Sequence, residues 1–158
     1  MNHVVLIPAT PDQEPILANL LELYAHDFSE FHPIELGPDG RYGYAKLPLY
    51  WREPDRYPFL ILVSGELAGL ALVRKVSPTV WDFSEFFVVR RYRRLGIGTR
   101  VAQEVLRKFT GSWQVRVMKS NTAALPFWER LIAAFVGKPV QPVSAENWLV
   151  FQFRSRSS

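Results

Sequence analysis

The sequence contains no cysteine among its 158 residues. A chain without cysteine forms no disulfide, binds no metal through thiolates and has no cysteine nucleophile. Histidine is also scarce, and His3, His26 and His32 lack the spacing of a metal site, so we expect no bound metal. No apolar run approaches the length that a membrane-spanning helix needs, and we expect no membrane association.

The N-terminus shows no basic, apolar and small-residue leader, because Met1 to His3 precede an apolar strand pattern directly. We therefore expect a cytoplasmic protein. The length suits a single domain over residues 1–158, with a short polar tail at 154–158 that we expect to be frayed. The sequence leaves the oligomeric state open, including a homodimer.

Charge is distributed unevenly along the chain. Residues 74–119 contain eleven Lys and Arg against three acidic residues, whereas residues 27–55 contain six acidic residues against three basic ones. The basic part suits a ligand that carries phosphates. The acidic part either consists of solvated surface charges or favours a cationic ligand.

A strand, a glycine turn and a helix follow one another in the basic part. Residues 81–89 are rich in aromatic and branched side chains, as in a buried strand. Residues 97–109 alternate between apolar and polar faces with the period of an amphipathic helix. Gly96 and Gly98 lie at the junction, and glycine allows backbone conformations that other residues avoid. Unpaired N–H groups at such a helix start form a binding site for an anion.

Three phosphate-binding motifs compete for this turn. The Walker motif requires a lysine after its last glycine, but Thr99 follows Gly98. The dinucleotide motif requires a third glycine where this chain has Val101. The third pattern, Arg/Gln-x-x-Gly-x-Gly/Ala, is matched by Arg93, Gly96 and Gly98. This turn resembles the acetyl-CoA-binding motif of the GNAT N-acetyltransferase superfamily.

A second segment and the order of the predicted elements extend the resemblance over about residues 3–153. Asn121 and Ala124 match the family's Asn-x-x-Ala-x-x-aromatic-Tyr element, and Trp128 stands where the family most often has tyrosine. Asn121 also suits the cap of a helix. The resemblance implies an α/β (α+β) fold, with a mixed, mostly antiparallel sheet flanked by helices.

The resemblance implies acetyl-CoA as co-substrate and transfer of its acetyl group to a primary amine of a small molecule or peptide. Backbone groups of residues 94–99 would bind the pyrophosphate, those of Phe86 and Val88 would bind the pantetheine arm, and the Val88 N–H would face the thioester oxygen. The implied cofactor-binding residues are Phe86, Val88, Arg93, Arg94, Leu95, Gly96, Ile97, Gly98, Thr99, Asn121, Phe127 and Trp128.

Glu85 is the candidate general base. An amine with a pKa near about 10 must lose a proton before it attacks, and a carboxylate among the aromatic residues of this strand would have a raised pKa. Glu85 could instead pair with an arginine or a helix end. Trp128 cannot protonate the leaving thiolate as a tyrosine would, which leaves water, Tyr24, Tyr92 or an unassisted step.

Acceptor specificity is expected in the irregular, aromatic-rich residues 26–57. Two other classes of function stay open. The chain could bind acetyl-CoA without turnover, as a sensor or structural subunit, and Trp128 favours that interpretation. The arginines at 90–94 could also bind nucleic acid, although they cluster at one turn rather than along a face, and we expect no nucleic-acid partner.

Overall fold

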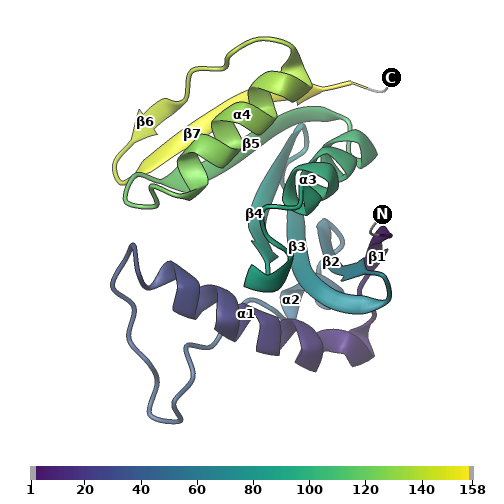
Figure 1. The fold of residues 1–158 in the computed structure, drawn as a ribbon, viewed down its shortest axis with the longest axis vertical. Helices are drawn as coiled ribbons and strands as arrows, with labels where there is room; N and C mark the ends of the chain where they lie inside the picture. The colour runs from purple at the N-terminus through teal and green to yellow at the C-terminus, as the bar shows by residue number, and fades with distance from the viewer. Residues whose placement is uncertain (1–2, 157–158) are drawn as a thin grey trace.

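A seven-stranded sheet in the order β1-β2-β3-β4-β5-β7-β6 forms the centre of the computed structural model, which describes residues 3–156 (Figure 1). The strands are β1 (Val4–Pro8), β2 (Arg56–Val63), β3 (Glu66–Ser77), β4 (Val80–Val88), β5 (Gly111–Met118), β6 (Val143–Ala145) and β7 (Trp148–Ser155). The helices are α1 (Glu14–Phe28), α2 (Leu49–Arg52), α3 (Ile97–Lys108) and α4 (Ala124–Val136), with short 3-10 turns at Pro11–Gln13 and Arg90–Tyr92. Within the described residues, only β4 and β5 pair in parallel.

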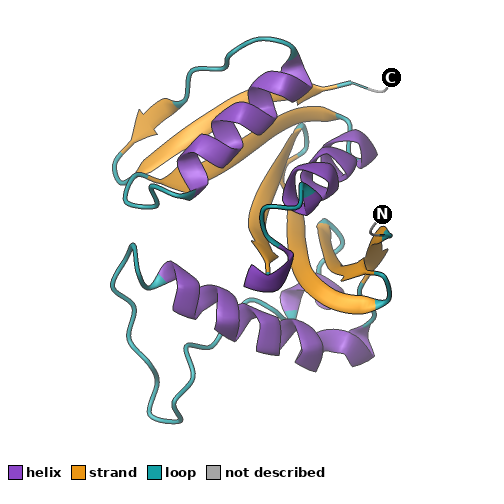
Figure 2. Cartoon of the chain, viewed as in Figure 1, coloured by secondary structure: helices purple, strands orange, loops and turns teal. Residues whose placement is uncertain are grey.

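Helices cover both faces of the sheet (Figure 2). On one face, α1 and α2 pack against β2 to β4, where Leu17 and Tyr50 join Leu70 in one buried cluster. On the other face, α3 and α4 cover a larger cluster that includes Val105 and Leu131. Within residues 3–156, no helix combines the length and the apolar character required to cross a membrane.

The observed architecture confirms the predicted mixed, mostly antiparallel sheet with flanking helices. The predicted frayed tail is wrong for Arg154 and Ser155, because both belong to β7 and pair with β5. Ser155 is buried, and its hydroxyl donates a hydrogen bond to the carbonyl oxygen of Leu106 in α3. The last two residues of the predicted tail lie outside the described residues.

The pairing between β4 and β5 is short. It runs from Val80 opposite Ser112 to Asp82 opposite Gln114, and the two strands then separate (Figure 1). We call the space beyond this pairing the β4–β5 gap. It exposes one backbone edge of β4 from Phe83 onward, so the middle of the sheet is open to a ligand.

A β-bulge in β4 determines which side chains face which helices. Leu72 of β3 pairs with Glu85 and the adjacent Val73 pairs with Phe83, which leaves Ser84 without a partner in β3. Side chains alternate between the faces of a regular strand, so one extra residue reverses the alternation. As a result, Phe83 and Phe86 contact each other at 5.3 Å between ring centroids on the α3–α4 side, and Glu85 faces α1.

Candidate active site

The turn before α3 presents a series of free backbone donors. Gly96 has a φ of 77° and Arg94 a φ of 65°, and these left-handed conformations direct the turn into the helix. Among residues 3–156, no acceptor is found for the backbone N–H groups of residues 94–99. The predicted donor turn is therefore present, and it has the geometry of an anion site at a helix start.

Gly98 differs from the expectation, because its φ lies outside the left-handed region. Its lack of a side chain serves packing instead. A Cβ at this position would lie 3.4 Å from the ring of Phe127 and 3.8 Å from that of Phe86. These two rings stack with centroids 6.1 Å apart. The contact brings the starts of α3 and α4 together with β4, as the predicted site requires.

The backbone of Phe86 and Val88 faces the β4–β5 gap. The N–H of Val89 donates to the carbonyl oxygen of Ala68 at 2.8 Å, which makes Val88 and Gly69 a non-hydrogen-bonded pair of the antiparallel ladder. Because such pairs alternate along a ladder, Phe86 and Ala71 form another. The N–H groups of Phe86 and Val88 therefore point away from β3 and toward the gap.

A cavity of about 400 Å³ adjoins the gap. Glu85 and Phe86 of β4 line it together with Trp128 of α4, while the remaining walls come from α1, the segment that follows it, β5 and Trp148. Figure 1 shows how α1 and its following loop face the separated β5 and β7 across this region. The candidate base thus lines the same cavity as Phe86, Asn121 and Trp128, three of the residues expected to bind acetyl-CoA.

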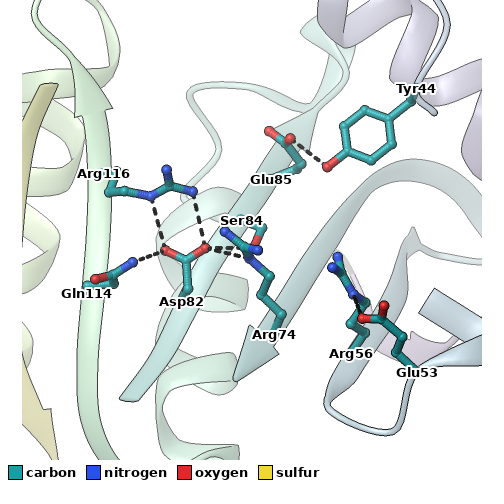
Figure 3. A network of polar contacts seen from close by, with 9 residues as sticks. All are labelled: Tyr44, Glu53, Arg56, Arg74, Asp82, Ser84, Glu85, Gln114 and Arg116. Atoms are coloured by element: carbon teal, nitrogen blue, oxygen red, sulfur yellow. Dashed lines mark hydrogen bonds and ion pairs between the residues drawn. The ribbon is translucent and has the colours of Figure 1, made fainter. Parts of the chain in front are cut away.

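Glu85 is hydrogen bonded within this cavity. The hydroxyl of Tyr44 donates to its Oε2 at 2.8 Å (Figure 3). Burial raises the pKa of Glu85 above its usual 4.5, although hydrogen bonds from Tyr44 and Tyr24 and the charge of Arg116 oppose that shift. The partner of Glu85 is thus a tyrosine of the segment after α1, rather than the arginine or helix end that the sequence also allowed.

Asn121 and Trp128 both line the cavity. Asn121 also accepts, at its Oδ1, a hydrogen bond from the N–H of Ala124, the first residue of α4, at 3.1 Å. It therefore caps the helix as well. Trp128 is 8% exposed and packs edge-to-face against Phe83 and Phe86, so its indole forms a wall of the cavity.

Arg93 takes a direction that the sequence did not indicate. Its Nε donates to the carbonyl oxygen of Val88 at 2.8 Å, and its Nη2 binds Asp27 at the end of α1. Arg90 binds the same carboxylate at 2.6 Å. Burial alone would raise the pKa of Asp27, but the hydrogen bonds from Arg93 and Arg90 outweigh it and hold that pKa below 3.8. In this structure the Arg93 side chain joins β4 to α1 instead of lining the donor turn.

A buried ionic cluster beside Glu85 is the feature that sequence reasoning missed. Asp82 is fully buried and accepts hydrogen bonds from Ser84, Gln114, Arg74 and Arg116 (Figure 3). Burial would raise the pKa of Asp82, but the hydrogen bonds from Ser84 and Gln114 and the charge and hydrogen bond of Arg116 lower it below 3.8. The available signal was a charged residue inside an otherwise apolar strand, since such residues are seldom buried without partners.

The aromatic residues of 26–57 have divided roles. Phe28 and Tyr44 line the cavity, as expected for acceptor recognition. Tyr50 packs in the core, and the Nε1 of Trp51 donates to the carbonyl oxygen of Ala9 at 3.0 Å. None of the acidic residues of 27–55, all of them described, lines this cavity; the charged side chains there are Glu85 and Arg116. The cavity at Glu85 thus gives no support to binding of a cationic acceptor by these acidic residues.

The chain is similar in sequence pattern and in fold to known acetyltransferases. The model of the acetyltransferase (GNAT) family matches residues 17–132. An acetyltransferase from Thermus thermophilus is 15% identical, with a TM-score of 0.74 and 96% of each chain covered. The PaiA N-acetyltransferase from Thermoplasma acidophilum, solved in complex with coenzyme A, is 8% identical, with a TM-score of 0.68 and coverage of 96% of this chain and 99% of that chain.

A GNAT family acetyltransferase from Elizabethkingia anophelis, solved with acetyl-CoA bound, is 12% identical, with a TM-score of 0.63 and coverage of 96% of this chain and 97% of that chain. No curated protein matches the sequence. At these identities the structural likeness establishes the fold alone, and the family model adds the assignment. Because that model spans most of the chain, the protein belongs to the GNAT family of acetyl-CoA-dependent N-acetyltransferases.

Proposed function

We propose that this protein transfers the acetyl group of acetyl-CoA to a primary amine by direct attack in a ternary complex, with Glu85 as general base. The observation that carries the proposal is the position of Glu85. Its carboxylate lies in a cavity beside the β4–β5 gap, one residue from Phe86 and three from Val88, whose N–H groups face the gap. A base and a set of backbone donors thus share one site.

The described residues fit acetyl-CoA as co-substrate. The free N–H groups of residues 94–99 suit a pyrophosphate, and the open edge of β4 suits an extended arm that contains amides. Arg94 and Arg100 are exposed beside the turn, where either could bind the ribose phosphate. When bound, the coenzyme supplies a thioester as the activated acetyl donor.

Glu85 removes the proton that prevents the amine from attacking. Alkyl amines have a pKa near about 10 and are mostly protonated at neutral pH. A carboxylate whose pKa is raised by burial accepts a proton more readily than an exposed one, and Tyr44 holds it in place. The N–H of Val88 would then stabilise the negative charge that develops on the carbonyl oxygen.

Within the described part of the chain, none of Trp128, Tyr92 and Tyr24 is suited to give a proton to the leaving thiolate. Trp128 is a very weak acid, and Tyr92 packs behind Val88 with Ile97 rather than in the cavity. Tyr24 does line the cavity, but burial and the nearby Glu85 raise the pKa of its hydroxyl well above 10. Because a simple thiol has a pKa of about 8.5, we infer that the thiolate leaves without a proton from a side chain.

Replacement of the base tests the proposal. We expect Glu85→Gln to lower the turnover number about 100-fold or more, as loss of a general base does. The dissociation constant of acetyl-CoA should change little, because Glu85 faces the opposite side of β4 from α3. Thiol release over a panel of amines measures turnover, and isothermal titration calorimetry measures binding. Glu104→Gln, a change on the outer side of α3, is the matched control.

Two results would contradict the proposal. Wild-type turnover in Glu85→Gln would remove Glu85 from the chemistry. Acetyl-CoA binding by the wild-type protein without thiol release for any amine would instead support a sensor, the function that Trp128 favoured in the sequence.

A further inference from the structure

A second cavity lies next to the cavity at Glu85, on the same face of the sheet. Arg116 of β5 lines both of them. The second cavity measures about 590 Å³ and is bounded by residues 53–56, by the end of β3 at 74–76 and by Gln114 and Arg116 of β5. Arg116 thus stands between the cavity that holds Glu85 and this second space.

The second cavity is rich in positive charge. Its basic lining residues are Arg56, Arg74, Lys75 and Arg116, and its acidic ones are Glu53 and Asp55. Glu53 already pairs with Arg56 at 2.8 Å. The remaining guanidinium groups, Arg74 and Arg116, lie over the buried Asp82 (Figure 3).

Asp82 alone cannot neutralise both guanidinium groups. Its shortest hydrogen bonds come from the neutral groups of Ser84 at 2.7 Å and Gln114 at 3.0 Å. Arg74 approaches at 3.3 Å, and Arg116 reaches it only at 3.4 Å. Asp82 thus shares one negative charge between two guanidinium groups, and Arg116 also lies near enough to Glu85 to oppose the rise of its pKa. Each guanidinium keeps further N–H donors for another partner.

Arg116 is also held in a defined direction. Its guanidinium lies over the ring of Trp148, 5.4 Å from the centroid, and Trp148 itself lines the cavity of Glu85. An arginine fixed by an aromatic ring and a carboxylate presents its remaining donors in one geometry, which suits a carboxylate or phosphate. The candidate base thus lies in one cavity, and the cations Arg116 and Arg74 line the cavity next to it.

We propose that the acceptor is a small amine that also carries an anionic group, a carboxylate or a phosphate, and that Arg116 and Arg74 bind this group while the amine lies at Glu85. This inference rests on the proposed function and adds the substrate class to it. The same cations disfavour a diamine or polyamine, because its second ammonium would lie beside Arg116.

Matched pairs of acceptors test the inference. The anionic probes are glycine, β-alanine, γ-aminobutyrate and O-phosphoethanolamine, and each is compared with the uncharged alkylamine and the diamine of similar length. The readout is the ratio of kcat/KM for the anionic and the uncharged member, measured by thiol release. We expect a ratio of about ten or more at the best chain length and the lowest values for the diamines. The carboxylate and phosphate probes distinguish the two anions.

Variants locate the anion site. Arg116→Gln should bring the ratio close to unity, Arg116→Lys should restore part of it, and Arg74→Gln should lower it independently. Because both acceptors are measured on one protein sample, any loss of folded protein cancels in the ratio. Arg154→Gln removes the same charge from the same face of the sheet but lies outside both cavities, so the wild-type ratio should persist.

The outcomes separate this inference from the proposed function. If alkylamines are acetylated as efficiently as their anionic partners, the substrate class is wrong and the acetyltransferase function stands. If the wild-type preference persists in both Arg116→Gln and Arg74→Gln, the anion binds elsewhere and the inference fails. If no amine releases thiol, the proposed function itself fails.

Discussion

The Nε–H of Arg93 donates a hydrogen bond to the carbonyl oxygen of Val88 at 2.8 Å. The same guanidinium binds Asp27 and lies over the ring of Phe87, 5.5 Å from the centroid. Three contacts on one side chain thus fix the end of β4 against α1. They hold Val88, whose N–H faces the gap, without bringing Arg93 to the donor turn.

Replacement of Arg93 should therefore weaken the binding of acetyl-CoA indirectly, through the position of β4. A lysine ammonium lacks the planar guanidinium and cannot bind both the carbonyl oxygen of Val88 and the carboxylate of Asp27. We therefore expect Arg93→Lys to reduce acetyl-CoA affinity about tenfold. Titrations with acetyl-CoA and with acetyl-pantetheine, which lacks the pyrophosphate, locate the effect. Equal losses for both ligands support a positioning role, whereas a loss for acetyl-CoA alone would mean that Arg93 contacts the pyrophosphate. Arg90→Lys, at a more exposed side chain, is the control.

The two glycines of the turn should respond differently to alanine. Gly96 has a φ of 77°, so Gly96→Ala should cost about 1 kcal/mol or more in unfolding free energy and weaken acetyl-CoA binding. Gly98→Ala meets Phe127 at ordinary contact distance and should change stability by less than about 1 kcal/mol. Urea unfolding and calorimetric titration measure both effects. Equal behaviour of the two variants would contradict the role assigned to Gly96.

Asp82 should stabilise the fold in a pH-dependent way. Its pKa is lowered in the folded state, so its contribution is present above the usual value of 3.8 and is lost as the pH falls through the lower folded value. Asp82→Asn leaves the two guanidinium groups without their counter-charge and should lower the unfolding free energy by about 3 kcal/mol near neutral pH. Denaturant titrations at several pH values measure this loss. It should shrink in acid, and the exposed Asp39→Asn should show none.

Glu85 should have the opposite effect on stability. Its pKa is raised in the folded state, so ionisation above the usual value of 4.5 disfavours folding. We expect Glu85→Gln to unfold at the same or a higher temperature than the wild-type protein at neutral pH, with the difference vanishing in acid. Wild-type turnover should rise with pH through the raised pKa of Glu85. A large loss of stability in Glu85→Gln would show that the carboxylate is structural.

Local patterns were sufficient to predict most of the fold. The alternation around Trp113, the four-residue spacing from Ile97 to Val105 and the glycine turn at Gly96 each specify a strand, a helix or a turn within a few residues. The tail was mispredicted because polar composition resembles disorder, although Ser155 pairs with β5 and binds α3. The segment of β6 gave no signal, since its three residues are all exposed.

The sequence indicated residues of the candidate site only where they belong to a recognisable motif or lie close to one. The distance of Glu85, Asn121 and Trp128 from recognisable elements makes them candidates, and all three line the cavity. The partners of Glu85 and Asp82 depend on the bulge at Ser84 and on a register between distant strands, and neither is encoded in a short window. The direction of Arg93 likewise depends on Asp27, which is far away in the sequence.

The parallel pairing between β4 and β5 ends after Asp82, so backbone pairing across the centre of the sheet is confined to a short stretch of the two strands. A coenzyme arm lying along the free edge of β4 would hydrogen bond to it as an added strand does. It would join the half that contains α1 to the half that contains α4. Binding of the coenzyme should then slow the hydrogen exchange of backbone amides on both sides of the β4–β5 gap, including those in strands that the ligand does not contact.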